Sequence, residues 1–352
     1  MNYFLLEYLA LFLATGVIVG LLTPRFRLLA LRKKIFDAPN SQHKTHTEPV
    51  PYLGGLAIIS GVILVTLPTT YITNPSLIGM VLGILLPPLF LGAIGLIDDL
   101  VNLSPWPRFI AQSLAGVAVA ATIIWTDTVG SPTGSRVLDI CITIIFIVGL
   151  SNSVNFFDNV DGGASGTVAI STIFLAFLSY STSQYYIAAL SIVLSGATAG
   201  FLWWNKSPAR IYMGDAGSLF LGSLLASLLV RFDPNPIAFP TFFFVPLFLI
   251  AVPLLDTCTV VTSRIARGVS PFKGGRDHLS HRLMRKGFSK VRAVILLWNM
   301  TFVFGLFAVT LSSVSFKFEP IMTLAASISW LILLFIFLRL PAQDQAIQQP
   351  KR

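Results

Sequence analysis

Long apolar runs separated by short polar segments repeat along the whole chain of 352 residues. Each run is close to the length of about 20 residues that an α-helix needs to cross a bilayer. We count eleven runs, at residues 2–23, 52–73, 77–97, 108–126, 137–155, 164–181, 184–204, 216–232, 237–262, 292–313 and 320–339. The pattern predicts an all-α, polytopic membrane protein with about eleven transmembrane helices.

The composition agrees with this prediction. Hydrophobic residues make up 55% of the chain and charged residues only 11%, whereas a soluble domain has about 25% charged residues. The first run carries Glu7 and no basic leader, so we interpret it as a retained span and not as a cleaved signal peptide. Cys141 and Cys258 lie inside predicted spans without ligand-like spacing, which is typical of buried apolar residues.

The basic residues predict the orientation of the spans. With the N-terminus outside and the C-terminus in the cytoplasm, 21 of the 24 Lys and Arg residues fall in cytoplasmic segments, and only Arg136, Arg231 and Lys317 stay outside. This distribution follows the positive-inside rule. The net charge of +9 is then explained by topology and by attraction to anionic lipid, and no nucleic-acid partner is expected.

No polar segment is long enough to form a separate soluble domain. We predict one integral membrane domain over residues 1–340 and a short cytoplasmic tail over residues 341–352. The chemistry is expected in cytoplasmic loops, where all four histidines and most of the carboxylates fall. These loops are 24–51, 98–108, 155–163, 204–215 and 263–292.

The first of four polar clusters is the adjacent pair Asp98 and Asp99 at the end of a long apolar run. One Asp at the bilayer centre costs roughly 2.5–3.5 kcal/mol on insertion scales. A polar helix end would explain a single Asp at a membrane boundary. Two adjacent carboxylates favour a bound cation, a proton transfer, or both.

A second cluster covers residues 152–163. Asn152, Asn155 and Asp158 follow one another at intervals of three residues, so on a helix they would share one face. Two glycines that follow would end this helix or let the backbone approach a ligand. A simple linker explains so many Asn and Asp residues poorly.

A third cluster surrounds Asp215, which precedes a predicted span. Ordinary capping of the helix N-terminus would be sufficient to explain this carboxylate alone. Gly214 and Gly217 on either side of it favour a close approach of the backbone to an anionic or metal-bound group near the start of the helix.

The fourth cluster is the basic segment 270–289. Asp277 would cap a short helix on which His278 and His281 share a face with Arg282. One explanation is a helix that lies on anionic lipid. The other is an arm that binds a diphosphate, because Arg presents several donors to phosphate oxygens.

Together, carboxylates and amides opposite a basic arm predict a site for a hard cation. Oxygen ligands without paired cysteines favour Mg²⁺, with Mn²⁺ as the alternative, over Zn²⁺. A divalent ion with Arg and His donors is typical of phosphoryl transfer, whereas a transporter would carry its ionisable groups near the bilayer midplane. The residues by themselves predict a metal-dependent phosphoryl transfer that involves a lipid.

In their order and spacing, the four clusters resemble the polyprenyl-phosphate N-acetylhexosamine-1-phosphate transferases, the family of the WecA, TagO and MraY enzymes. The resemblance extends from DAPNSQHKTHTEPVPYLGG at residue 37 to HRLMRKGFS, which ends at residue 289. It implies a multi-pass protein of a bacterial plasma membrane with a cytoplasmic active site and Mg²⁺, and a homodimer would fit the family.

The resemblance also implies the reaction. A sugar-1-phosphate, which we expect to be N-acetylglucosamine-1-phosphate, passes from a UDP-N-acetylhexosamine to undecaprenyl phosphate or another polyprenyl phosphate. UMP is released, and the product enters a cell-envelope polysaccharide pathway at its first membrane step.

Roles for single residues follow from the same resemblance. It makes Asp98, Asp99 and Asp158 the catalytic carboxylates, with Asp98 as the base, and makes Asp215 the main metal ligand beside Asp98 and Asp99. The positions implied to bind the substrates, which include an aromatic ring for uracil and two histidines for the diphosphate, are Lys44, His46, Asn155, Asp161, Gly162, Asn205, Tyr212, Arg276, His278, His281 and Arg282.

The chain departs from the family pattern at a few positions. Ser280 replaces the middle His of an HxHH motif, Asn159 stands where Gly is usual, and His43 and Tyr52 stand where Arg is common. The basic arm resembles the WecA and TagO branch, which favours a simple UDP-N-acetylhexosamine donor. Open alternatives are MraY-like transfer of phospho-MurNAc-pentapeptide, a transporter of lipid-linked or nucleotide sugars, and an inactive scaffold.

Overall fold

The computed structural model describes residues 3–37, 50–126, 133–234, 243–271, 274–313 and 317–342. Its elements are α1 (Tyr3–Lys33), β1 (Phe36–Asp37), β2 (Val50–Pro51), α2 (Gly54–Thr73), η1 (Pro75–Leu77), α3 (Ile78–Val101), α4 (Pro105–Thr126), α5 (Arg136–Phe157), α6 (Gly163–Ser181), α7 (Tyr185–Asn205), α8 (Gly214–Leu229), α9 (Phe244–Leu249), α10 (Ala251–Ala266), α11 (Leu279–Arg285), α12 (Lys290–Ser313) and α13 (Glu319–Arg339).

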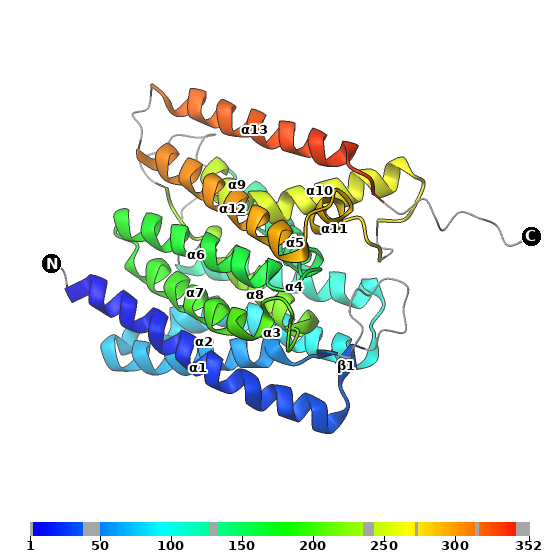
Figure 1. The fold of residues 1–352 in the computed structure, drawn as a ribbon. Coiled ribbons are helices and arrows are strands. Elements are labelled where there is room, and N and C mark those ends of the chain that lie inside the picture. The colour runs from blue at the N-terminus through cyan, green and yellow to red at the C-terminus, as the bar shows by residue number, and fades with distance from the viewer. Residues whose placement is uncertain are drawn as a thin grey trace, which may run out of the picture.

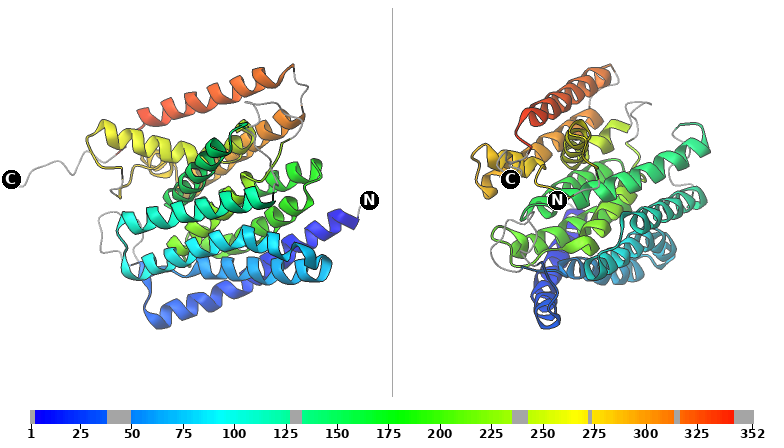
Figure 2. Two further views of the ribbon diagram at one scale, coloured as in Figure 1. Left: turned by 180° about the vertical axis from the view of Figure 1, so that it is seen from behind. Right: turned by 90° about the vertical axis from the view of Figure 1, so that its right-hand side faces the viewer.

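The long helices lie side by side in one bundle, with α1 and α13 at opposite outer edges (Figure 1), and two further views show the same arrangement (Figure 2). Within the described residues, nine helices are long and apolar enough to cross a membrane. The prediction of an all-α, polytopic membrane protein is therefore confirmed. The short β1–β2 pair is an addition that the sequence did not predict.

Helix α8 forms the centre of the bundle. All its residues from Ala216 to Leu229 are buried, and it packs against α3 and α5. A helix that is apolar on every side lies in a protein core or in lipid, and α8 is covered by its neighbours. With 16 residues it is about 24 Å long, which is shorter than the predicted span at 216–232 and shorter than a bilayer core of roughly 30 Å.

The predicted span at 237–262 is wrong as one continuous helix. In the described part of it, α9 and α10 are separated at Ile250. Pro253 has no N–H to donate to the carbonyl of Leu249, four residues earlier. The hydroxyl of Ser171 on α6 donates to this carbonyl instead, at 2.6 Å. A neighbouring helix thus satisfies the backbone at the break.

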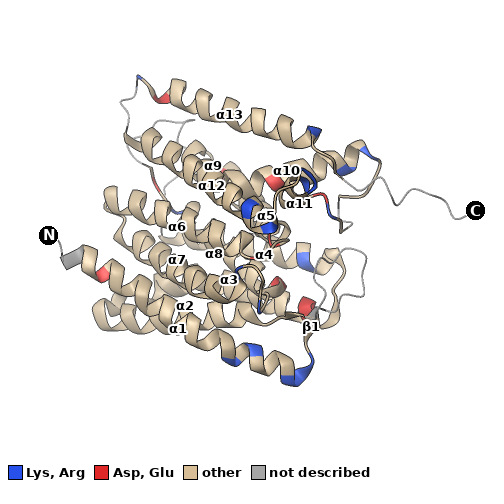
Figure 3. Ribbon diagram, in the orientation of Figure 1, with Lys and Arg blue, Asp and Glu red and all other residues tan. Residues whose placement is uncertain are grey.

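Most of the Lys and Arg residues of the described segments lie at the end of the bundle away from the N-terminus, together with several carboxylates (Figure 3). We call this end the basic end. Helices α3 and α5 finish here, α8 begins here, and the short helix α11 lies nearby (Figure 1). The fold therefore gathers three of the four polar clusters on helix ends that meet.

Candidate active site

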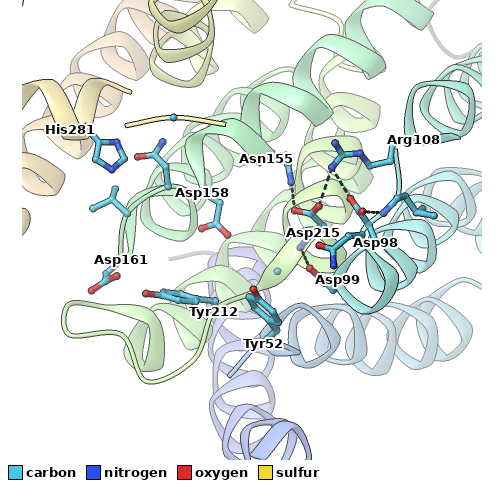
Figure 4. A pocket seen from close by; sticks show the side chains of 16 residues that line it. Tyr52, Asp98, Asp99, Arg108, Asn155, Asp158, Asp161, Tyr212, Asp215 and His281 are labelled. Carbon is cyan, nitrogen blue, oxygen red and sulfur yellow. Dashed lines mark hydrogen bonds and ion pairs between the residues drawn. The ribbon is translucent and has the colours of Figure 1, made fainter. Parts of the chain in front are cut away.

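A cavity of about 510 Å³ lies at the basic end of the bundle (Figure 4). Residues from all four predicted clusters and from the segment before α2 contribute to its wall. Its lining consists of Tyr52, Asp98, Asp99, Asn102, Leu103, Arg108, Asn155, Asp158, Asn159, Val160, Asp161, Tyr212, Gly214, Asp215, Gly275 and His281.

At one side of the cavity, which we call the acidic end, a single guanidinium nitrogen joins two carboxylates. Arg108 Nη1 donates to Asp98 Oδ2 at 2.6 Å and to Asp215 Oδ2 at 3.2 Å. The second oxygen of Asp98 accepts from the amide of Leu103 at 2.6 Å. The second oxygen of Asp215 accepts from Asn155 Nδ2 at 2.7 Å. Each carboxylate thus has one oxygen fixed by an amide donor and one turned toward Arg108.

Asp99 caps helix α8 from a different helix. Its two oxygens accept from the backbone amides of Asp215 at 2.8 Å and Ala216 at 3.1 Å, which would otherwise be free N–H groups at the helix start. Gly214 has φ +71°, and a Cβ there would lie 2.5 Å from the Asp99 carboxylate. The anionic group next to Gly214 is therefore Asp99 itself, whereas Gly217 packs against Gly55 and Met213. The interpretation of Asp215 as its own helix cap is wrong.

The predicted shared face of Asn152, Asn155 and Asp158 holds only in part. Asn155 reaches Asp215, but Asn152 turns to α4, where it exchanges hydrogen bonds of 2.7 and 3.3 Å with Gln112. Asp158 is the first residue after α5, and its carboxylate points into the cavity between the acidic end and His281 (Figure 4).

The carboxylate of Asp158 accepts no hydrogen bond from the described residues. Burial, followed by the charges of Asp99 and Asp161, raises its pKa to about 7. A carboxylate that has this pKa is only partly ionised at neutral pH. A nearby cation would favour its charged form.

Asp161, His281 and Tyr212 form the opposite end of the cavity (Figure 4). Lys290 Nζ donates to Asp161 at 3.1 Å. Burial, followed by the charge of His278 and of nearby arginines, lowers the pKa of His281 to about 3, so its imidazole is neutral at pH 7. Burial and the neighbouring carboxylates raise the pKa of the Tyr212 hydroxyl, so this residue is a neutral aromatic with a hydrogen-bonding tip.

The basic arm is folded differently from the sequence prediction. Asp277 does not cap α11; its carboxylate pairs with Arg264 at 2.7 Å and with Arg267 at 2.7 Å. The cap comes from Asp256 on α10, which accepts from the amide of Leu279 at 2.7 Å. The other oxygen of Asp256 lies 2.7 Å from Nδ1 of His278.

Arg282 does not reach the cavity, which corrects its predicted role in substrate binding. Its side chain is fully buried, at 0% exposure. Nη1 donates to the carbonyls of Phe337 at 2.9 Å and Leu340 at 2.8 Å, and Nε donates to the carbonyl of Asp277 at 2.8 Å. The guanidinium therefore joins α11 to the end of α13.

Several other predicted substrate-binding residues lie behind the cavity wall. Asn205 is buried, and its side-chain oxygen accepts from Gly162 N and Ser165 Oγ, both at 3.0 Å, so it shapes the loop after α5. His278 and Arg276 belong to the arm but do not line the cavity. Lys44 and His46 lie outside the described residues.

Two departures from the family pattern contact each other. Ser280 Oγ donates to Asn159 Oδ1 at 2.5 Å, and Asn159 Nδ2 donates to the carbonyl of Phe156 at 2.8 Å. This contact joins the loop that carries Asp158 to the helix that carries His281. The two substitutions form one structural unit.

Arg108 is a site residue that the sequence did not predict. The available signal was its position as the single basic residue of the loop at 98–108, nine residues after Asp99. Among the described residues, no three His, Cys, Asp or Glu side chains converge closely enough to hold a metal by themselves. Arg108 thus provides the positive charge between Asp98 and Asp215.

Known proteins resemble this chain along most of its length. The model of glycosyl transferase family 4 matches residues 81–233. A Bacillus subtilis protein named probable undecaprenyl-phosphate N-acetylglucosaminyl 1-phosphate transferase is 28% identical over 97% of this chain and 92% of the relative. A Mycolicibacterium smegmatis decaprenyl-phosphate N-acetylglucosaminephosphotransferase is 31% identical over 83% of this chain and 80% of the relative.

A relative with a different sugar in its name is also similar. The phospho-N-acetylmuramoyl-pentapeptide-transferase of Halalkalibacterium halodurans is 27% identical over 87% of this chain and 97% of the relative. The matched range 81–233 contains Asp98, Arg108, Asp158 and Asp215. The likeness therefore includes the acidic end of the cavity.

Proposed function

The chain belongs to glycosyl transferase family 4, and from this premise we propose that it transfers N-acetylglucosamine-1-phosphate from UDP-N-acetylglucosamine to undecaprenyl phosphate or a similar polyprenyl phosphate. UMP is the second product. The relatives from B. subtilis and M. smegmatis bear names of this type. We place the reaction on the cytoplasmic side of a bacterial plasma membrane, at the basic end of the bundle.

One observation carries the proposal: Asp98, Asp158, Asp215 and Arg108 converge on one cavity at the basic end of a membrane bundle. Ionisable side chains of this kind are expected where a charged headgroup must be handled at a membrane boundary. A cavity of about 510 Å³ also falls in the range of roughly 300–1,000 Å³ typical of small-molecule sites.

The chemistry is a displacement at phosphorus, either in one direct step or through an aspartyl-phosphate intermediate. In the direct route, an oxygen of the lipid phosphate forms a bond to the β-phosphorus of the donor, while the bond from that phosphorus to the bridging oxygen breaks and UMP leaves with its electrons. A phosphate monoester has a second pKa near 6, so the attacking group is mostly ionised at pH 7. Asp98 therefore positions the lipid phosphate as much as it removes a proton, and Arg108 supplies donors to phosphate oxygens.

The family implies a divalent cation, and the donor set fits Mg²⁺ or Mn²⁺. Asp98 and Asp215 offer hard oxygens at one end of the cavity, and no Cys lines it. Mg²⁺ is usually held by one or two carboxylates together with substrate phosphates and water, so a cluster of three protein ligands is not required. Asp215 and Asp98 would hold the ion, which reduces the repulsion between two phosphates when bound.

The test is a UMP-release assay on the full chain, purified in detergent. Labelled UDP-N-acetylglucosamine and undecaprenyl phosphate should yield a lipid-linked sugar phosphate and an equal amount of UMP. The reaction should stop with a chelator and recover with Mg²⁺. No UMP from any UDP-N-acetylhexosamine, in protein that keeps its thermal unfolding transition, would contradict the proposal.

A second candidate is the transfer of phospho-MurNAc-pentapeptide, because the H. halodurans relative carries that activity in its name. Parallel reactions with UDP-MurNAc-pentapeptide and with UDP-N-acetylgalactosamine separate the donors. A transporter would instead move labelled nucleotide sugar into vesicles without forming UMP.

A further inference from the structure

We propose that Arg108 is an internal counter-ion of the metal site, which competes with the divalent cation for Asp98 and Asp215 and then binds the diphosphate of the donor. This inference rests on the proposed function. It adds that the metal and the nucleotide sugar favour each other's binding, and it names the side chain that couples them.

The first support is the position of the guanidinium. Arg108 Nη1 lies between Asp98 Oδ2 and Asp215 Oδ2, at 2.6 and 3.2 Å. The remaining oxygen of each carboxylate already accepts from Leu103 N or Asn155 Nδ2. A cation that binds both carboxylates through the two oxygens that face Arg108, Asp98 Oδ2 and Asp215 Oδ2, must therefore displace Arg108.

The second support is the set of donors that Arg108 leaves unused. A guanidinium has five N–H donors, but only Nη1 makes hydrogen bonds to described residues. The side chain is 30% exposed and lines the cavity. Arg282 has the opposite character, since it is fully buried among carbonyls. Arg108 thus reaches the cavity and still has donors for an anion.

The coupling follows from these two points. Arg108 is 30% exposed and Asp98 only 6% exposed, so water screens this ion pair only in part. A divalent ion can replace the guanidinium because it carries twice the charge, but the replacement reduces the apparent affinity for the ion. Once displaced, Arg108 needs a new anion, and its planar fork of donors matches phosphate oxygens. A donor diphosphate that accepts Arg108 therefore strengthens metal binding, and by linkage the metal strengthens donor binding.

The test measures Mn²⁺ binding to the full-length protein in detergent, from the electron paramagnetic resonance signal of free Mn²⁺. Without nucleotide, Arg108→Gln should bind Mn²⁺ about 10-fold more tightly than the wild type, a typical size for such coupling. Adding UDP-N-acetylglucosamine, without lipid acceptor, should tighten Mn²⁺ binding in the wild type and much less in Arg108→Gln. Equal or weaker Mn²⁺ binding by Arg108→Gln would overturn the proposal.

Two further variants separate this mechanism from a general effect of charge. Lys290→Gln removes a cation that contacts Asp161 and neither Asp98 nor Asp215, so its Mn²⁺ affinity should change far less. Arg108→Lys keeps the charge but replaces the planar fork of donors by a compact ammonium, and its affinity should fall between those of the wild type and Arg108→Gln. Similar tightening in Arg108→Gln and Lys290→Gln would overturn the specific role of Arg108.

These measurements distinguish a failure of the counter-ion role of Arg108 from a failure of the proposed function. If the wild type releases UMP but Arg108→Gln does not bind Mn²⁺ more tightly, only the counter-ion role fails. If the wild type binds Mn²⁺ as described but releases UMP from no UDP-sugar, the proposed reaction fails. Under the full mechanism Arg108→Gln combines tighter Mn²⁺ binding with slower turnover, a combination that simple structural damage would not produce.

Discussion

The acidic end of the cavity and the basic arm around α11 are both dense in charge, but their side chains have different partners. At the acidic end, Asp98 and Asp215 share one nitrogen of a partly exposed Arg108. In the arm, Arg264 and Arg282 are buried and hold Asp277 and backbone carbonyls. The first region keeps its charges available to the cavity, and the second uses them inside the fold.

This difference shows how to separate function from structure in a polar cluster. A charged group that is buried and bonded to the protein's own carboxylates and carbonyls, as Arg264 and Arg282 are, stabilises the fold. A charged group that lines a cavity with donors or acceptors to spare is suited to ligands. Among the described side chains of the arm, His281 is the one that lines the cavity. Substitutions in the two regions should therefore affect different properties.

The largest expected effect is on turnover at the acidic end. Asp215→Asn keeps the size of the side chain but removes the charge proposed to hold the cation, and UMP release should fall by roughly 10²–10³-fold, as for loss of one preorganised electrostatic group. The melting temperature should change little. The measurement is UMP release together with thermal unfolding in detergent.

Asp139→Asn is the matched control for this substitution. Asp139 accepts from Thr133 near the start of α5, away from the cavity, so the variant should keep wild-type turnover. Turnover by Asp215→Asn at the wild-type rate would remove Asp215 from the metal site and undo the contrast between the two regions.

The second effect concerns stability in the basic arm. Arg282→Met removes the donor shared by the carbonyls of Phe337, Leu340 and Asp277. A buried polar group left without its partner costs about 1–3 kcal/mol, so the melting temperature should fall by several degrees. The KM for the donor should stay unchanged in the folded fraction.

The exposed Arg292 provides the control, because Arg292→Met removes a charge from the same end of the bundle without breaking a buried contact. Its melting temperature should stay near that of the wild type. An Arg282→Met protein of normal stability with a strongly raised KM would show that Arg282 binds substrate after all.

The apolar pattern predicted most of the helices because each long helix needs its own apolar run. Two features escaped it. The break at Ile250 depends on Pro253 and on a hydroxyl from α6, and the short α8 depends on being enclosed by neighbouring helices. Both are tertiary effects, and a window along the sequence does not contain the partner residues.

The sequence predicted the carboxylates of the candidate site but not their hydrogen-bond partners. Asp98, Asp158 and Asp215 line the cavity, as their clustering indicated. The capping of α8 by Asp99 and the pairing of Arg108 with Asp215 join positions more than 100 residues apart. Hydrogen-bond partners at such separations follow from the fold, so neither the spacing nor the family resemblance showed that Arg282 is buried or that Arg108 belongs to the site.

A third and smaller effect is expected where the two regions meet, at the bond from Ser280 to Asn159. Asn159→Ala and Ser280→Ala should each lower kcat several-fold, because each releases the Asp158 loop from the helix of His281. The double variant should be little worse than either single variant. Contacting residues typically show an interaction energy of about 0.5–3 kcal/mol in such a cycle, and strictly additive losses would show that the bond does not position the site.

The smallest effect concerns Asp158, which lies between the two ends of the cavity. Burial raises its pKa from 3.8 to about 7 in the folded protein, so the native state holds a proton that the unfolded chain has lost. Without divalent cation, the melting temperature should therefore fall as pH rises from about 4 to about 7. Asp158→Asn cannot lose this proton and should show a flatter pH dependence, whereas Asp139→Asn should follow the wild type. If Asp158→Asn and the wild type lose the same number of degrees between pH 5 and pH 8, Asp158 does not carry this proton, and the cavity has no uncompensated carboxylate at its centre.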